Sequence, residues 1–265
     1  IPVPPYSSKV VYLDDGPDCD VVAPVGGVKV KMILGGAMDP TIGMMRDDLR
    51  QQGLVPATEP YTALGYSIEN TGAAAATAVM QATGPLAVVD WVLVQLHAAA
   101  PAYTLLGTRA ALLLRNGKVV TPTGNDLITF NSTTVGRYLA VRHRNHLGVL
   151  CTTVLTADAM VDFTRYDLPV YGDDAQTTID ERKCLWPGDA TGNAEVKYTG
   201  AGNDRDAILD VLGGSEPITV VPGYLREDVN LNGFVSYTGA NNDRDMVLQA
   251  IGSTLATAIR HEAMP

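Results

Sequence analysis

Apolar and polar residues alternate with a period of two along most of the first 165 residues. The run that starts at Val28 reads Val-Lys-Val-Lys-Met-Ile-Leu, and its alternating start is the pattern of a strand that buries one face. Similar runs follow at 87–96, 109–114, 118–121, 127–130, 138–143, 149–155 and 160–163. Asn116-Gly117, between two of these runs, is typical of a tight hairpin. Closely spaced runs with turn residues between them predict a mainly β chain with an antiparallel β-sandwich at 28–180.

The segments around this sandwich are different. Residues 1–27 hold a proline-rich stretch, which we expect to form an extended arm with one short strand at Val10–Leu13. Its acidic cluster is either a solvated loop or a second cation site: Asp14, Asp15, Asp18 and Asp20. The stretch Met38–Gln52 is expected to hold one helical turn or a short helix. No GxGxxG turn follows a strand, which argues against a nucleotide-binding fold.

The C-terminal third contains an internal duplication. Segments 189–213 and 228–252 align without a gap, and both contain Tyr-Thr-Gly-Ala, Asn-Asp-Arg-Asp and a closing glycine. Chance does not plausibly produce such a match. Each copy therefore folds as one unit of the same kind, and we expect a small domain at 185–252 followed by a C-terminal tail at 253–265.

Each copy has the oxygen spacing of a calcium loop. Positions 1, 3 and 5 of the second copy are Asp228, Asn230 and Asn232, and a glycine that permits a tight turn comes next. Alternate side chains of such a loop converge on one point, where their oxygens suit Ca²⁺. The first copy carries three oxygens at the same spacing, with alanine in place of the glycine: Asp189, Thr191 and Asn193.

A short helix is expected to follow each loop. The second helix should start near Asn242, whose side chain is suited to cap it. Its apolar face comprises Met246, Val247, Ala250 and Ile251, and Gly252 should end it. Val235 should anchor the loop on the core.

These residues resemble the duplicated dockerin fold, in which Asp-x-Asn-x-Asn-Gly-x-Val and a leucine-containing helix occur twice. The resemblance covers roughly 185–252 and implies calcium ligands, with an Asp at position 12 closing each loop. Here position 12 of the second copy is Gly239. The closing carboxylate is therefore expected from Asp243 or Asp245, of which Asp245 matches the family best. Its counterparts in the first copy are Asp204 and Asp206.

A broader resemblance covers nearly the whole chain. Phrases such as Thr-Glu-Pro-Tyr-Thr-Ala-Leu-Gly at 58–65 and Val-Arg-His-Arg-Asn-His-Leu-Gly-Val at 141–149 are similar to a C-terminal module of large bacterial secreted, adhesin-like surface proteins. That resemblance implies export and no known activity. The start Ile-Pro-Val-Pro-Pro fits a processed N-terminus or a trimmed chain equally well.

The net charge and the cysteine content limit which partners and which disulfide bonds the chain can have. The chain has 19 Lys and Arg against 29 Asp and Glu, a net charge of −10, which argues against a nucleic-acid partner. Residues 185–252 carry ten acidic and four basic side chains, so the acidity is concentrated in the duplicated loops. The three cysteines allow either a Cys19–Cys184 disulfide with Cys151 free, or three buried thiols.

Other motifs have simpler explanations than catalysis. His143 and His146 lack a third ligand partner in sequence, so a charged strand end is a better interpretation than a metal site. Asp90-Trp91 is most simply a strand with a buried Trp, and no GxSxG elbow exists. Arg205 and Arg244 either brace the loop carboxylates or lie exposed at the helix starts. We expect no enzymatic activity.

Together these features predict a secreted, calcium-stabilised structural or adhesive surface protein. It would assemble with itself or with other surface components, for example as an extracellular filament subunit. The alternatives are a docking module for a cohesin-type partner and a glycan-binding or carbohydrate-active module.

Overall fold

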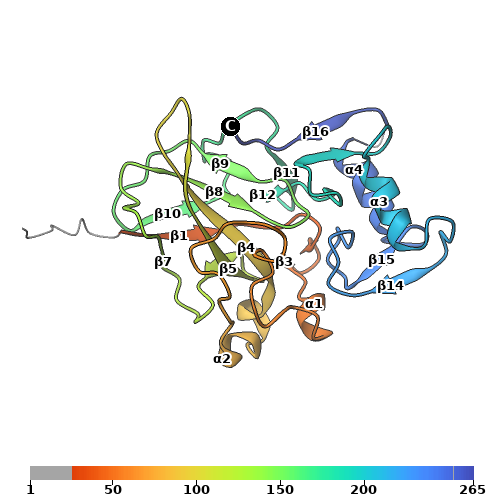
Figure 1. Ribbon diagram of the computed structural model, residues 1–265, viewed down its shortest axis with the longest axis horizontal. Helices are drawn as coiled ribbons and strands as arrows, with labels where there is room; N and C mark the ends of the chain where they lie inside the picture. The colour runs from red at the N-terminus through yellow and green to blue at the C-terminus, as the bar shows by residue number, and fades with distance from the viewer. Residues whose placement is uncertain (1–25, 253) are drawn as a thin grey trace, which may run out of the picture.

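The computed structural model of the chain describes residues 26–252 and 254–265. The described part is mainly β, with mostly antiparallel pairing, as predicted. A larger unit built on one broad sheet lies beside a smaller unit that contains the duplication (Figure 1). The predicted strand at Val10–Leu13, its acidic neighbours and a Cys19–Cys184 bond lie outside the described residues.

Eight strands form the sheet of the larger unit. Their order is β10-β1-β6-β5-β4-β8-β9, and β7 also pairs with β1. All pairs in this sheet are antiparallel except β1 with β10. The period-two runs located every one of these strands, whose bounds are β1 Gly27–Lys31, β4 Val88–His97, β5 Leu105–Leu114, β6 Lys118–Val120, β7 Ile128–Thr129, β8 Tyr138–Arg142, β9 Val149–Cys151 and β10 Ala159–Asp162.

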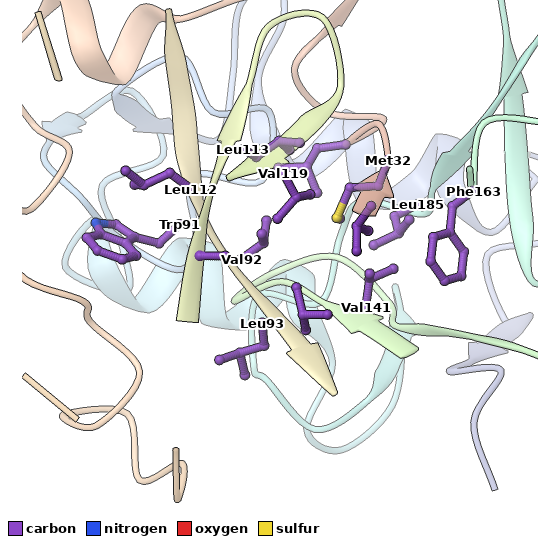
Figure 2. Packing of buried hydrophobic residues seen from close by; sticks show 14 of the residues in the cluster. Met32, Trp91, Val92, Leu93, Leu112, Leu113, Val119, Val141, Phe163 and Leu185 are labelled. Atoms are coloured by element: carbon purple, nitrogen blue, oxygen red, sulfur yellow. The ribbon is translucent and has the colours of Figure 1, made fainter. Parts of the chain in front are cut away.

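Strand β4 is the centre of the core. All ten of its residues are buried, including Asp90, Gln95 and His97. Apolar side chains from β4 and β5 gather with those of β8 and of segments far away in the sequence, such as Met32 and Phe163 (Figure 2). The predicted Asn116-Gly117 hairpin joins β5 to β6, and Gly117 has the positive φ of 88° that its turn requires.

Short elements surround the sheet. The expected helical turn within 38–52 is confirmed near its end, whereas the two-residue strands before it were not predicted. Cys184 is buried in β12, and it is not bonded to the buried Cys151. The bounds are β2 Met38–Asp39, β3 Met44–Met45, α1 Asp48–Gln51, α2 Thr77–Met80, a 3₁₀ turn at Gly84–Leu86, β11 Gln176–Ile179 and β12 Arg182–Leu185.

The smaller unit contains two copies of a strand and a helix. The copies comprise β13 Glu195–Lys197 with α3 Asp204–Val211, and β15 Phe234–Ser236 with α4 Asp243–Ala250. Asn242 caps α4 through the amide of Asp245, as predicted, and Asn203 caps α3 in the same way. A separate apolar cluster, which includes Val235 and Val247, holds the two copies together.

The end of the chain joins both units. After α4, β16 (Ile259–His261) pairs with β13 of the first copy, and Ala263 then bridges Val149 of the large sheet. A further strand, β14 (Val220–Pro222), pairs with β15 of the second copy. The C-terminal residues, which were expected to form a simple tail, therefore supply the partner strand of β13 and a bridge to the large sheet. None of the described helices has the length and apolarity needed to span a membrane.

Candidate functional site

The second loop wraps around the carboxylate of Asp228, which is fully buried. Its Oδ1 accepts the amide N–H of Asn232 at 3.0 Å and its Oδ2 that of Gly233 at 2.8 Å. The side-chain oxygen of Asn230 accepts the same Asn232 amide, which is shared between the two acceptors, and that of Asn232 accepts the amide of Phe234. Gly233 makes the turn with a φ of 87°. Because a carboxylate or amide oxygen has two lone pairs, all three side chains retain capacity for another partner.

Asp243, the first residue of α4, closes the second loop from the opposite side. Its Oδ1 accepts the amides of Val229 and Asn230, and its Oδ2 accepts the amide of Ser236 at 2.9 Å. The Ser236 hydroxyl lies 3.5 Å from the same Oδ2. These donors occupy most of the accepting capacity of Asp243, which therefore binds the loop backbone directly.

Asp245 lies apart from this arrangement. Its Oδ1 pairs with Arg244 at 2.7 Å, and its Oδ2 accepts from the side chain of Asn242 at 2.8 Å. Arg244 also stacks on Tyr237, 4.9 Å from the ring centroid. The family resemblance favoured Asp245 as the closing residue, yet Asp243 is the carboxylate that faces the loop.

The first loop has the same design with fewer free oxygens. Asp189 accepts the amides of Gly192, Asn193 and Ala194. The hydroxyl of Thr191 lies 3.1 Å from Asp204 and 3.4 Å from Asp189, so it acts as a donor here. Asp204 also accepts the amides of Thr191 and Lys197, whereas Asp206 pairs with Arg205. Internal hydrogen bonds therefore satisfy the first loop more completely than the second.

The larger unit holds the backbone of the second loop. Asn145 donates to the carbonyl oxygens of residues 226 and 228 at 2.8 and 2.7 Å. Arg46 donates to that of residue 230 and Gln52 to that of residue 232, both at 2.7 Å. Alternate carbonyls of the loop thus point outward to the larger unit. Gly36 permits this approach, since a Cβ there would lie 2.1 Å from the carbonyl oxygen of Val229.

A buried ionic network underlies this contact. The Asp90 carboxylate accepts from His143 Nε2 at 3.0 Å, from Arg144 Nε at 3.1 Å and from the Tyr224 hydroxyl at 2.6 Å. Arg144 stacks on the Tyr224 ring at 4.3 Å and donates to the carbonyl of Leu225. Burial alone would raise the pKa of Asp90, but Arg144 and His143 outweigh it and lower that pKa below its ordinary value. The pair is therefore charged.

The two histidines connect this network to Gly36. His146 Nε2 accepts the amide of Gly36 at 3.0 Å, so its Nδ1 carries the proton and faces Asn145 Oδ1 at 2.8 Å. Burial first, and then the nearby His143 and Arg144, hold the pKa of His146 well below its usual value. Both rings are fully enclosed and fully engaged, so they are structural members of the interface.

The loop carboxylates are electrostatically costly in the folded protein. Burial raises the pKa of Asp228 to about 6, and burial together with the charge of Asp228 raises that of Asp243 to about 7. Asp204 of the first loop is raised to about 6, and Asp189 is raised as well. The folded loops thus favour either a proton or a compensating cation.

The sequence pattern predicted the loop residues, but it did not predict the side chains of the larger unit that hold the second loop. It interpreted the basic cluster that contains His143 as a strand end pairing with local carboxylates, whereas its partner Asp90 is 53 residues away. A charged residue inside an otherwise apolar strand was the available signal. Within the described ranges, no group of three or more His, Cys, Asp or Glu side chains is arranged to hold a metal ion. An oxygen site here would therefore depend on Asn side chains and backbone carbonyls.

Comparison with family models, with curated proteins and with solved structures finds no match to this chain. The candidate site is therefore described by its geometry alone.

Replacing Asp90 by Asn should destabilise the whole protein. The change leaves the buried Arg144 without its counter-charge, which costs about 3–5 kcal/mol of unfolding free energy. Asp167→Asn is the control, because its pair with Arg165 is exposed and should contribute about 0–1 kcal/mol. Urea unfolding of both variants measures the difference. Equal stabilities would show that the buried pair does not hold the units together.

Asp243→Ala should destabilise the protein far more than Asp245→Ala does. The first variant leaves three buried amides without an acceptor, for a loss on the order of 3 kcal/mol. The second removes a half-buried pair at the helix start and should cost about 0.5 kcal/mol. Urea unfolding in the presence of a chelator measures the contribution of these hydrogen bonds to stability without any contribution from a bound ion. An Asp245 variant as unstable as the Asp243 variant would contradict the assignment of Asp243 as the closing carboxylate.

Proposed function

We propose that this chain is a secreted, calcium-stabilised structural or adhesive protein of the cell surface, which assembles with itself or with other surface components. An extracellular filament subunit is one such role. The observation that carries the calcium proposal is the second loop, in which Asp228 and Asn230 accept the same amide and, with Asn232, retain accepting capacity. The two-layer sandwich and the dockerin-like nature of the repeats are part of the same proposal.

Calcium suits this loop for two reasons. Ca²⁺ takes six to eight oxygen ligands, among them carboxylates and amide side chains, and this loop offers both kinds. Its positive charge would also offset the burial that raises the pKa of both Asp228 and Asp243, and the repulsion by Asp228 that further raises the pKa of Asp243. Asp189 of the first loop already accepts three loop amides, whereas Asp228 accepts two, so the second loop is the preferred site.

Calcium should raise the melting temperature, and more so at about pH 8 than at about pH 5. The folded pKa values of Asp228 and Asp243 lie above the ordinary value, so their contribution to stability is present at low pH and is lost as pH rises toward about 6 and 7. Without the ion, the melting temperature should therefore fall by several degrees across this range. Calcium replaces the lost protons.

Thermal unfolding with calcium or with a chelator, together with metal analysis, measures this effect. Asn232→Ala should weaken the calcium response, and Asn193→Ala, its counterpart in the first loop, should leave it intact. An unchanged melting curve and no bound metal would refute calcium stabilisation.

Self-association is supported by exposed apolar side chains on the strand pair β14–β15 of the smaller unit. Val220 and Phe234 of this pair are 52% and 41% exposed, and Ile218, just before β14, is 81% exposed. The strand pair β13–β16 carries Ile259, which is 46% exposed, beside an ion pair between Glu195 and His261. Exposed apolar groups of this kind are typical of an association surface, and a second copy of the chain is the occupant we propose.

Light scattering and electron microscopy of the purified chain with calcium test the assembly. We expect oligomers or filaments that Val220→Glu combined with Phe234→Ser abolishes. Lys197→Glu, on the strand pair β13–β16, is the control and should leave assembly unchanged. A wild-type chain that stays monomeric at high concentration would overturn the assembly proposal without affecting the calcium proposal.

A further inference from the structure

A groove of about 870 Å³ lies between the two units. Residues of β2 and β11 line it from the larger unit, and residues of the second loop and α4 line it from the smaller unit. Ligand sites commonly form at such junctions between units, at volumes of about 300–1,000 Å³. Two of the lining residues, Asn230 and Asn232, also belong to the proposed calcium loop.

Most charges that line the groove are paired. Asp48 pairs with Arg46 at 2.9 Å, and Asp245 pairs with Arg244 at 2.7 Å. Arg46 also donates to the carbonyls of residues 36 and 230. Asp39 accepts from the amide and the hydroxyl of Thr41, and it is the one charged side chain of the described lining without an ion pair. The groove therefore offers no available cation, which disfavours an acidic ligand.

The groups that remain available are uncharged donors and acceptors. The side chains of Thr177, Asn241 and Gln249 make no hydrogen bond within the described part of the chain, and neither does the Nδ2 of Asn232. Apolar surface from Ile179 and Met246 lies between them. This combination of side-chain amides, a hydroxyl and small apolar patches is suited to a ligand that alternates hydroxyl groups with C–H faces.

The duplication shows which of these residues the shared fold does not require. At the positions of Asn241, Met246 and Gln249, the first copy has Gly202, Ala207 and Asp210. In contrast, Asn-Asp-Arg-Asp, which caps the helix and closes the loop, is identical in the two copies. Five of the eight second-copy residues that line the groove therefore differ from the first copy, whereas Asn232, Asn242 and Asp245 are shared.

We propose that this groove binds a neutral oligosaccharide. Amide side chains both donate and accept, and so match the vicinal hydroxyls of a sugar. An extended peptide fits less well, because β11 contributes Thr177 and Ile179, two residues apart, and so presents a face and not a pairing edge. An acidic ligand would find no free cation. The groove is separate from the proposed association surface, and it shares Asn230 and Asn232 with the proposed calcium loop.

The test uses the full chain and a panel of uncharged oligosaccharides of hexoses and N-acetylhexosamines, screened on an array and measured by calorimetry. Asn241→Gly and Gln249→Asp introduce the first-copy residues, and each should weaken binding about tenfold, the equivalent of one hydrogen bond. Asn241 has a φ of 55°, which glycine adopts freely, so this variant should fold normally. Asp210→Gln, the reverse exchange in the first copy, is the matched control.

Binding of a neutral oligosaccharide that both groove variants weaken and the control retains would support the inference. No binding across the panel, equal binding by all variants, or binding confined to acidic saccharides or peptides would overturn it. Melting curves with calcium and light scattering of the same variants separate this result from the proposed function, because neither measurement depends on Asn241 or Gln249.

Discussion

The contact between the two units depends on one buried ion pair. Asp90 is the third residue of the fully buried strand β4, and Arg144, His143 and Tyr224 together stabilise its charge. Arg144 then reaches the carbonyl of Leu225, immediately before the second loop. In many cores a hydrophobic pair would give the same stability, but it would not fix the direction from which the partner side chain approaches. Here the pair orients the chain that enters the loop, and the hydrogen bonds from Asn145, Arg46 and Gln52 follow from that position.

The two copies of the duplicated unit consequently have different surroundings. The second is held by the larger unit through four of its backbone carbonyls, whereas side-chain and amide hydrogen bonds within the first satisfy most of its loop. The same Asn-Asp-Arg-Asp sequence therefore closes two loops that differ in how many of their oxygen atoms are already hydrogen-bonded. The external support allows the second loop to keep oxygen atoms free, and it places α4 beside the larger unit, where the groove forms.

The strands and the duplicated helices could be predicted because their signals are local. Period-two runs located all eight strands of the large sheet, and the repeated Asn-Asp-Arg-Asp marked both helix caps. The choice between Asp243 and Asp245 could not be made from spacing, since both lie in the first helical turn and only the path of the loop decides which one faces inward. The partnership of Asp90 with Arg144 joins residues 54 positions apart, which no local pattern specifies. The short strands β2 with β3 and β11 with β12 form local hairpins, but each strand is too short for a clear alternating pattern.

The return of the chain to the larger unit has a mechanical consequence. Glu262 binds the amide of Gly148 and pairs with Arg142, while its own amide donates to Ala194 of the first loop. Tension applied at the C-terminal residues would therefore reach the large sheet through Arg142 and Gly148 before it loads the helices. Because Glu262 also binds Ala194 and β16 pairs with β13, the first copy of the duplicated unit would share this load with the sheet.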